Sequence, residues 1–163
     1  MDFPQRKPTR LKDYDYSQNG YYFVTICSHN KKCIFSSIVG EGFPLPQLTT
    51  DGKIVNNYIL NINKKYPCVI VDKYVIMPNH IHIILILKND GRGNPSPTIT
   101  NVMGWLKYNA TAQINKHYNT AGNKIFQRSF HDHIIRGEQD YLKIWNYIDT
   151  NPQQWSEDCF FIA

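Results

Sequence analysis

The hydrophobic residues of this chain follow two periods in alternation, which predicts strands and helices that alternate along the sequence. Segments rich in aromatic and β-branched residues predict strands at residues 21–27, 68–76, 80–87 and 124–135. Apolar residues that recur every three or four positions predict helices at residues 51–66, 98–116 and 138–151. Polar segments rich in glycine, proline and asparagine predict loops at residues 40–46 and 89–97. Helix boundaries are expected at capping residues and at proline, namely Thr50, Thr98 or Thr100, and Pro152.

The order of these elements is strand, helix, strand, strand, helix, strand, helix. This order fits an α+β fold in which an antiparallel sheet carries helices on one face, the ferredoxin-like arrangement. The chain has 163 residues, the length of one domain, and it can bury a core without disulfides or a structural metal. We expect residues 1–18, which are polar and basic, to form an arm and residues 19–163 to form a single domain.

Charge and cysteine usage narrow the class of protein. The net charge of +5 favours a polyanionic partner such as a nucleic acid. The four cysteines form no C-x-x-C pair and predict neither a zinc ribbon nor a disulfide scaffold, which fits a reducing cytosol. The first residues have no apolar signal-peptide core, and no apolar run approaches the roughly 20 residues that span a bilayer, so neither secretion nor membrane insertion is expected.

His80 and His82 are the most informative residues of the chain. Side chains two apart in a strand project from the same face, so the two imidazoles lie side by side in an otherwise apolar segment. Such burial is unfavourable unless both rings find partners, and a shared cation would satisfy both. The pair is therefore half of a metal site, or else two histidines hydrogen-bonded to backbone near a sheet end.

The last predicted helix contains a second pair, Tyr147 and Asn151. Residues four apart share a helix face, so a phenol and an amide oxygen point the same way. If this helix packs on the face with the histidines, Asn151 supplies a third ligand and Tyr147 points at the cation. Tyr141 lies roughly 240° around the helix from Tyr147 and cannot face the same metal. Alternatively, Tyr147 packs in the core, and Asn151 is simply the residue before Pro152 at the end of the helix.

Three blocks of sequence together resemble one family. The blocks are the run Met77-Pro78-Asn79-His80-Ile81-His82, residues 127–136 and residues 147–152, and they occur in this order. Over residues 21–155 the chain resembles the REP-associated tyrosine transposases, bacterial relatives of the single-tyrosine insertion-sequence transposases in the HUH nuclease superfamily.

The resemblance implies an enzyme that cleaves and rejoins single-stranded or hairpin-forming, REP-like DNA through a 5′-phosphotyrosine intermediate. It implies that Tyr147 is the nucleophile, that His80 and His82 hold Mg²⁺ or Mn²⁺, and that Asn151 stands where many relatives have a glutamine ligand. A bacterial cytoplasmic, nucleoid-associated protein is expected. Some relatives assemble active sites across a homodimer and others are monomers, so the oligomeric state stays open.

Basic residues nearest in sequence to these elements are the candidates for DNA contacts: Arg10, Lys107, Arg128 and Arg136. Arginine and lysine bind phosphate without reading sequence. For each of them a solvated surface charge is the alternative. His131 and His133 are expected to be structural or to face DNA, not to form a second metal site.

Two other functions compete with a DNA transposase. A catalytically silent DNA-binding protein of the same fold would have lost turnover, although His80, His82 and Tyr147 are all in place. A histidine-triad nucleotide hydrolase also has alternating histidines on a strand, but it requires a further histidine where this chain has Ile84.

Overall fold

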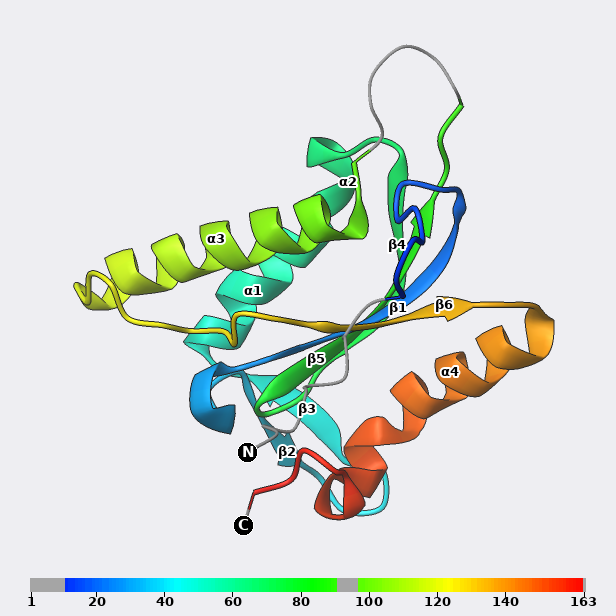
Figure 1. The fold of residues 1–163 in the computed structure, drawn as a ribbon. Coiled ribbons are helices and arrows are strands. Elements are labelled where there is room, and N and C mark those ends of the chain that lie inside the picture. Colours follow the sequence, from blue (N-terminus) through cyan, green and yellow to red (C-terminus); the bar gives the residue numbers. More distant parts are fainter. Residues whose placement is uncertain (1–10, 91–96, 163) are drawn as a thin grey trace, which may run out of the picture.

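A four-stranded antiparallel sheet forms the centre of the molecule (Figure 1). The computed structural model describes residues 11–90 and 97–162. The strands, in their spatial order, are β4 (Val69–Ile76), β5 (His80–Leu87), β1 (Gly20–Cys27) and β6 (His131–Ile135). This order and the antiparallel pairing confirm the predicted α+β, ferredoxin-like class.

Helices cover both faces of this sheet (Figure 1). The helices are α1 (Thr50–Leu60), α2 (Ile62–Lys65), α3 (Ile99–Tyr118) and α4 (Glu138–Thr150). The first three lie on one side of the sheet and α4 lies on the other, where the prediction had placed all helices on one face. Every residue of β5 is buried, so this strand requires cover from both sides.

The two faces of β5 have different neighbours. Ile81, Ile83 and Leu85 belong to the main core with the apolar sides of α1 and α3. Ile84 belongs to a smaller cluster with Ile144 and Ile148 of α4. His80 and His82 share the parity of Ile84, so the strand presents both histidines to the face that α4 covers.

A short hairpin was not predicted from the sequence. Its strands are β2 (Ser36–Val39) and β3 (Leu45–Leu48), and its tip includes residues 40–44, which the sequence placed in a loop. The strands are four residues long and largely exposed, and Pro46 interrupts the donor pattern of β3. They therefore lack the long apolar run on which strand prediction depends. A single 3₁₀ turn, η1 (His29–Lys31), follows β1.

Capping residues fix the starts of α1 and α3. Thr49, one residue before the predicted Thr50, caps α1, and its hydroxyl accepts a hydrogen bond from the Gly52 backbone at 3.1 Å. Thr98 and Asn101 form a reciprocal capping box at α3. The boundary of α4 is also close to the prediction, but the chain continues past it as a 3₁₀ segment, η2 (Asn151–Glu157).

Further expectations concern the N-terminal arm, the cysteines and membrane spans. Of the predicted arm, Tyr14 and Tyr16 pack against the main core, whereas Arg10 lies outside the described part of the chain. All four cysteines are free. None of the described helices is both long and apolar enough to cross a membrane. The domain boundary at residue 18 stays a prediction.

Gly52 provides a test of the packing between α1 and the segment before the hairpin. A Cβ at this position would lie 1.9 Å from the Phe35 carbonyl oxygen, so the backbone would have to shift. We expect Gly52→Ala to lower the free energy of unfolding by about 1–3 kcal/mol, in spite of the higher helix propensity of alanine. Gly104→Ala in α3 is the matched control, because its Cβ meets nothing within 4 Å and should stabilise the protein. Denaturant unfolding measures the stability of both variants. A Gly52→Ala variant that is more stable than the unaltered protein would show that Gly52 does not pack closely against the Phe35 carbonyl.

Candidate active site

His80 and His82 lie side by side at the start of β5, and both are buried. Their ring centroids are 4.6 Å apart. The Nδ1 atom of His80 lies 2.9 Å from Asn79 Oδ1, and that of His82 lies 2.7 Å from Thr25 Oγ1. Side-chain oxygens, not the backbone groups considered as the alternative, therefore hold both rings by Nδ1. Each Nε2 atom is left available for another partner.

The positions of these two oxygens follow from the strand register. Thr25 is the direct cross-strand partner of His82 in the pairing of β1 with β5, and its hydroxyl is buried. Asn79 precedes β5, and its amide nitrogen donates to the carbonyl oxygens of Lys31 and Phe160. Asn79 Oδ1 only accepts, so His80 carries its proton on Nδ1. In this tautomer the Nε2 atom carries no proton, so its lone pair can bind a cation.

Helix α4 brings Tyr147 to the histidines. Ile144 and Ile148 anchor the helix against Ile84 and Ile135 of the sheet, and Tyr147 lies on the adjacent part of the helix surface. The Tyr147 hydroxyl is 3.3 Å from His82 Nε2, to which it donates when Nδ1 carries the proton. A cation on this nitrogen would take the same lone pair, and it would leave the phenol free for another acceptor.

Asn151 and Asp158 complete the cluster from the segment after α4. The 3₁₀ segment turns the chain back over the site, and Asn151 Nδ2 donates to Asp158 Oδ2 at 2.7 Å. That carboxylate oxygen is 3.9 Å from His80 Nε2. Ligand atoms of His80, His82 and Asp158 all lie within 4.8 Å of one another, which is close enough for one metal ion. Asp158 was not among the predicted site residues.

Two buried atoms of the cluster make no hydrogen bond among the described residues. These atoms are His80 Nε2 and Asn151 Oδ1. Leaving such a lone pair buried without a partner is unfavourable by roughly 1–3 kcal/mol. Both atoms are uncharged and carry a lone pair of the kind that binds divalent cations, so the cluster fits a metal ion. The same observation accounts for burying two imidazoles and an amide in one place.

Burial keeps both histidines neutral. It lowers the pKa of His80 to about 4, although the Asp158 carboxylate and the Asn151 amide oppose the shift. The pKa of His82 is also well below its usual value, because of burial first and of His80 second. Both rings can therefore bind a cation at neutral pH without losing a proton.

Burial also favours the neutral form of Tyr147, which for a phenol means a raised pKa. Burial, together with the charges of Asp158 and Cys159, raises the pKa of Tyr147 to about 12, and the Asn151 amide only partly opposes this. The phenol is therefore protonated at neutral pH. A nearby cation or a base is needed before its oxygen can act as a strong nucleophile.

Aromatic side chains of the C-terminal segment cover the histidines. The Phe160 ring lies 4.5 Å from the His80 ring and the Trp155 ring 5.9 Å from it, measured between centroids. Asn79 ties this segment down through its hydrogen bond to the Phe160 carbonyl, at 2.8 Å. The cover removes His80 from water, which accounts for its low pKa.

Other tyrosines and histidines are separate from the cluster. The Tyr141 hydroxyl donates to Asp72 at 2.7 Å and its ring packs against Tyr21. His133 pairs with Asp140 at 2.8 Å, a carboxylate that also accepts from the Arg136 backbone. These contacts give His133 a structural role at the start of α4, and His131 lies at the other end of β6.

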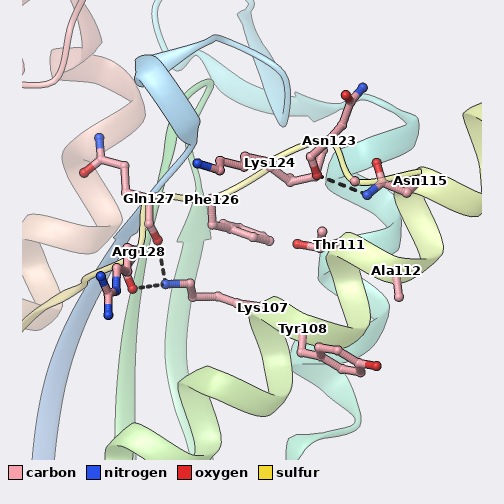
Figure 2. A pocket seen from close by; sticks show the side chains of 12 residues that line it. Lys107, Tyr108, Thr111, Ala112, Asn115, Asn123, Lys124, Phe126, Gln127 and Arg128 are labelled. Atoms are coloured by element: carbon pink, nitrogen blue, oxygen red, sulfur yellow. Dashed lines mark hydrogen bonds between the residues drawn. The ribbon is translucent and has the colours of Figure 1, made fainter. Parts of the chain in front are cut away.

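The predicted DNA-binding residues have different surroundings. Lys107 of α3 donates from its ammonium group to the carbonyl oxygens of Gln127 and Arg128, at 2.6 and 2.9 Å (Figure 2). It thus holds this segment against the helix. The side chains of Arg128 and Arg136 are exposed. Contact of Lys107, Arg128 and Arg136 with DNA stays a prediction, as does that of Arg10, which lies outside the described residues.

Known proteins match most of the chain. The family described as "Transposase IS200 like" matches residues 15–151. An uncharacterized protein of Haemophilus influenzae is 34% identical over 173 aligned positions, which include 96% of this chain and 93% of that protein.

Two solved structures share the fold. A REP-associated tyrosine transposase bound to a REP hairpin has a TM-score of 0.65 at 20% identity, over 89% of this chain and 73% of that one. A transposase candidate of Deinococcus radiodurans has a TM-score of 0.50 at 14% identity, over 86% of this chain and 95% of that one.

The hydrogen bond between Thr25 and His82 should matter for metal binding. We expect Thr25→Val to weaken Mn²⁺ binding by about 10- to 100-fold, because the His82 ring loses the partner that fixes its orientation and tautomer. Thr25→Ser keeps a hydroxyl and should bind Mn²⁺ nearly as the unaltered protein does. Isothermal titration calorimetry measures the Mn²⁺ affinity of both variants. Equal affinity of the valine variant, with an unchanged melting temperature, would show that this bond does not orient the ring.

The low pKa values predict how metal binding depends on pH. Protons compete with a cation for Nε2 only when the pH approaches the histidine pKa, which is about 4 for His80. Mn²⁺ affinity should therefore be nearly constant between pH 8 and 6 and fall at lower pH. Two histidines with an ordinary pKa of ~6.5 would instead lose affinity about tenfold between pH 8 and 6. Titrations across this range distinguish the two behaviours.

Proposed function

Because the chain belongs to the IS200-like transposase family, as its resemblance to the REP-associated tyrosine transposases predicts, we propose that it cleaves and rejoins single-stranded DNA through Tyr147. One observation carries the proposal. The Tyr147 hydroxyl lies 3.3 Å from a ring nitrogen of His82, inside a cluster whose donor atoms fit a divalent cation. A phenol beside a metal site is the arrangement that nucleophilic attack on a phosphate requires.

The metal would be held by His80 and His82 through Nε2, by Asn151 through its amide oxygen and by the Asp158 carboxylate. Imidazole favours transition metals, whereas carboxylate and amide oxygens favour Mg²⁺ and Mn²⁺. A mixed set of this kind suits Mn²⁺, and Mg²⁺ is the second candidate. When bound, the cation polarises the scissile phosphate and stabilises the charge that develops on its oxygens. Asp158 adds a negative charge that the predicted ligand set of two imidazoles and one amide lacked.

The reaction would proceed by exchange of one phosphoester for another. Tyr147 Oη forms a bond to phosphorus and loses its proton, while the bond from phosphorus to the 3′ oxygen breaks. The 3′ oxygen leaves as a hydroxyl, and the 5′ phosphate stays on the tyrosine. Attack by a 3′-hydroxyl on this link reverses the step and rejoins DNA. The phosphoester is conserved throughout, so no nucleotide cofactor is consumed.

The residues that we assign to the proposed site all come from one chain. Tyr147 and His82 are 65 residues apart in sequence and meet through the packing of α4 on the sheet. We therefore propose cleavage in cis, with the tyrosine and the metal ligands from the same copy. Cleavage in cis would not require a homodimer.

Hairpin DNA is the proposed substrate. A solved neighbour of this fold is a REP-associated tyrosine transposase bound to a REP hairpin. The positive net charge of this chain suits a nucleic acid of any sequence. The alternative is a silent DNA-binding protein, against which stands the presence of the phenol, both imidazoles and the amide in one cluster.

A covalent adduct tests the proposed chemistry. Hairpin oligonucleotides with randomised single-stranded flanks and a 3′ label, incubated with Mn²⁺ or Mg²⁺, should form a protein–DNA species that survives denaturing electrophoresis. We expect Tyr147→Phe to abolish it, because the phenyl ring lacks the attacking oxygen. Tyr141→Phe is the matched control on the same helix, and it should retain the adduct because Tyr141 bonds to Asp72 instead. DNA binding without any adduct in the unaltered protein would favour the silent alternative.

A further inference from the structure

A cavity of about 460 Å³ lies between α3 and residues 122–128, apart from the metal cluster. Figure 2 shows its two walls, with Lys107 and Tyr108 on the helix and Lys124 and Arg128 on the facing segment. Its size is that of pockets that take small organic molecules. Neither the metal site nor the proposed nucleophile uses it.

The inner part of the cavity is apolar and fixed. Ile125 and Phe126 line it and are buried in the main core, and the Phe126 ring stacks on Phe35 at 5.3 Å. The Lys107 ammonium holds the wall in place through the carbonyls of Gln127 and Arg128. A flat apolar group could therefore enter without rearranging the backbone.

The rim of the cavity combines an exposed ring with two cations. Tyr108 is 74% exposed, which is high for an aromatic side chain in the middle of a helix. Lys124 and Arg128 are exposed as well, and neither makes an ion pair within the described residues. Exposed aromatic rings and basic side chains around one cavity are the combination that binds single-stranded nucleic acid, since bases stack on the rings and phosphates pair with the cations.

Strand pairing connects this cavity to the metal cluster. The Gln127 backbone donates to the Cys27 carbonyl at 2.9 Å, and Phe126 forms a bridge with Ser28. Cys27 is in turn the cross-strand partner of His80. The cavity wall is thus separated from the His80 backbone by two strand spacings, roughly 10 Å. The cavity lies on the α3 side of the sheet and the histidines face α4, so a DNA strand that occupies both sites must pass around the β6 edge of the sheet.

We propose that this cavity binds an unpaired nucleotide of the DNA substrate, with its base against Tyr108 and the phosphates of the adjoining strand near Lys124 and Arg128. The proposal rests on the proposed function, because it places the single strand that the tyrosine cleaves. Stacking accepts every base, so the cavity adds affinity for the single strand and positions it without selecting a sequence.

Binding of a single-stranded DNA of 20 thymidine nucleotides tests the proposal separately from cleavage. Fluorescence anisotropy without metal, in the Tyr147→Phe background, measures binding alone. Tyr108→Ala should weaken binding by about 5- to 150-fold, the effect expected for losing one stacked base. Tyr108→Phe keeps the ring and should bind within about twofold of the parent. Phe43→Ala, which removes an equally exposed ring from the hairpin tip, is the matched control and should change nothing.

The salt dependence of binding provides a second readout. Removing one phosphate contact from a single strand lowers the slope of log affinity against log salt concentration by about 0.7. Lys124→Ala and Arg128→Ala should each show this change, whereas Lys64→Ala on α2 should not. Unchanged affinity and slope in the Tyr108, Lys124 and Arg128 variants would overturn the cavity as a nucleotide site, as would absence of binding by the parent. The adduct assay would still decide the role of Tyr147.

Discussion

Strand β5 is buried on both faces, and this burial determines where the helices and the polar partners of its histidines lie. One face of this strand is aliphatic and packs on α1 and α3, while the other begins with two histidines and continues with Ile84. Imidazoles can be buried there only if their nitrogen atoms find partners. Thr25 and Asn79 each satisfy one nitrogen, and the geometry of the strand directs the other toward α4. The candidate site thus follows from the need to complete a buried polar cluster.

Helix α4 and the segment after it supply that completion. Ile144 and Ile148 dock the helix on the sheet, and Tyr147 and Asn151 project from the same region and face the histidines. Asp158 and the Phe160 ring then close the cluster from the returning chain. A cation, a phenol and a protected, water-poor environment are what phosphoryl transfer to a tyrosine requires, and one short stretch of chain provides the last two.

The sequence predicted much of this arrangement because strand and helix periods are local properties. His80 and His82 must share a face of any strand they occupy, and Tyr147 and Asn151 must share a face of any helix. The division of the helices between two faces was not predicted, because it depends on which side of the sheet each connection crosses. The hairpin was missed because four-residue, exposed strands have no clear pattern. Asp158 was missed because it follows a proline-containing turn, where no periodicity relates it to the histidines.

A crystal structure of the protein grown with Mn²⁺ would locate the ion without ambiguity through its anomalous scattering. We expect one manganese ion bound to Nε2 of both His80 and His82, with an oxygen of Asn151 or Asp158 beside it and the Tyr147 hydroxyl facing it. An ion bound elsewhere, with the two imidazoles still hydrogen-bonded as they are here, would show that the two histidines do not form the metal site.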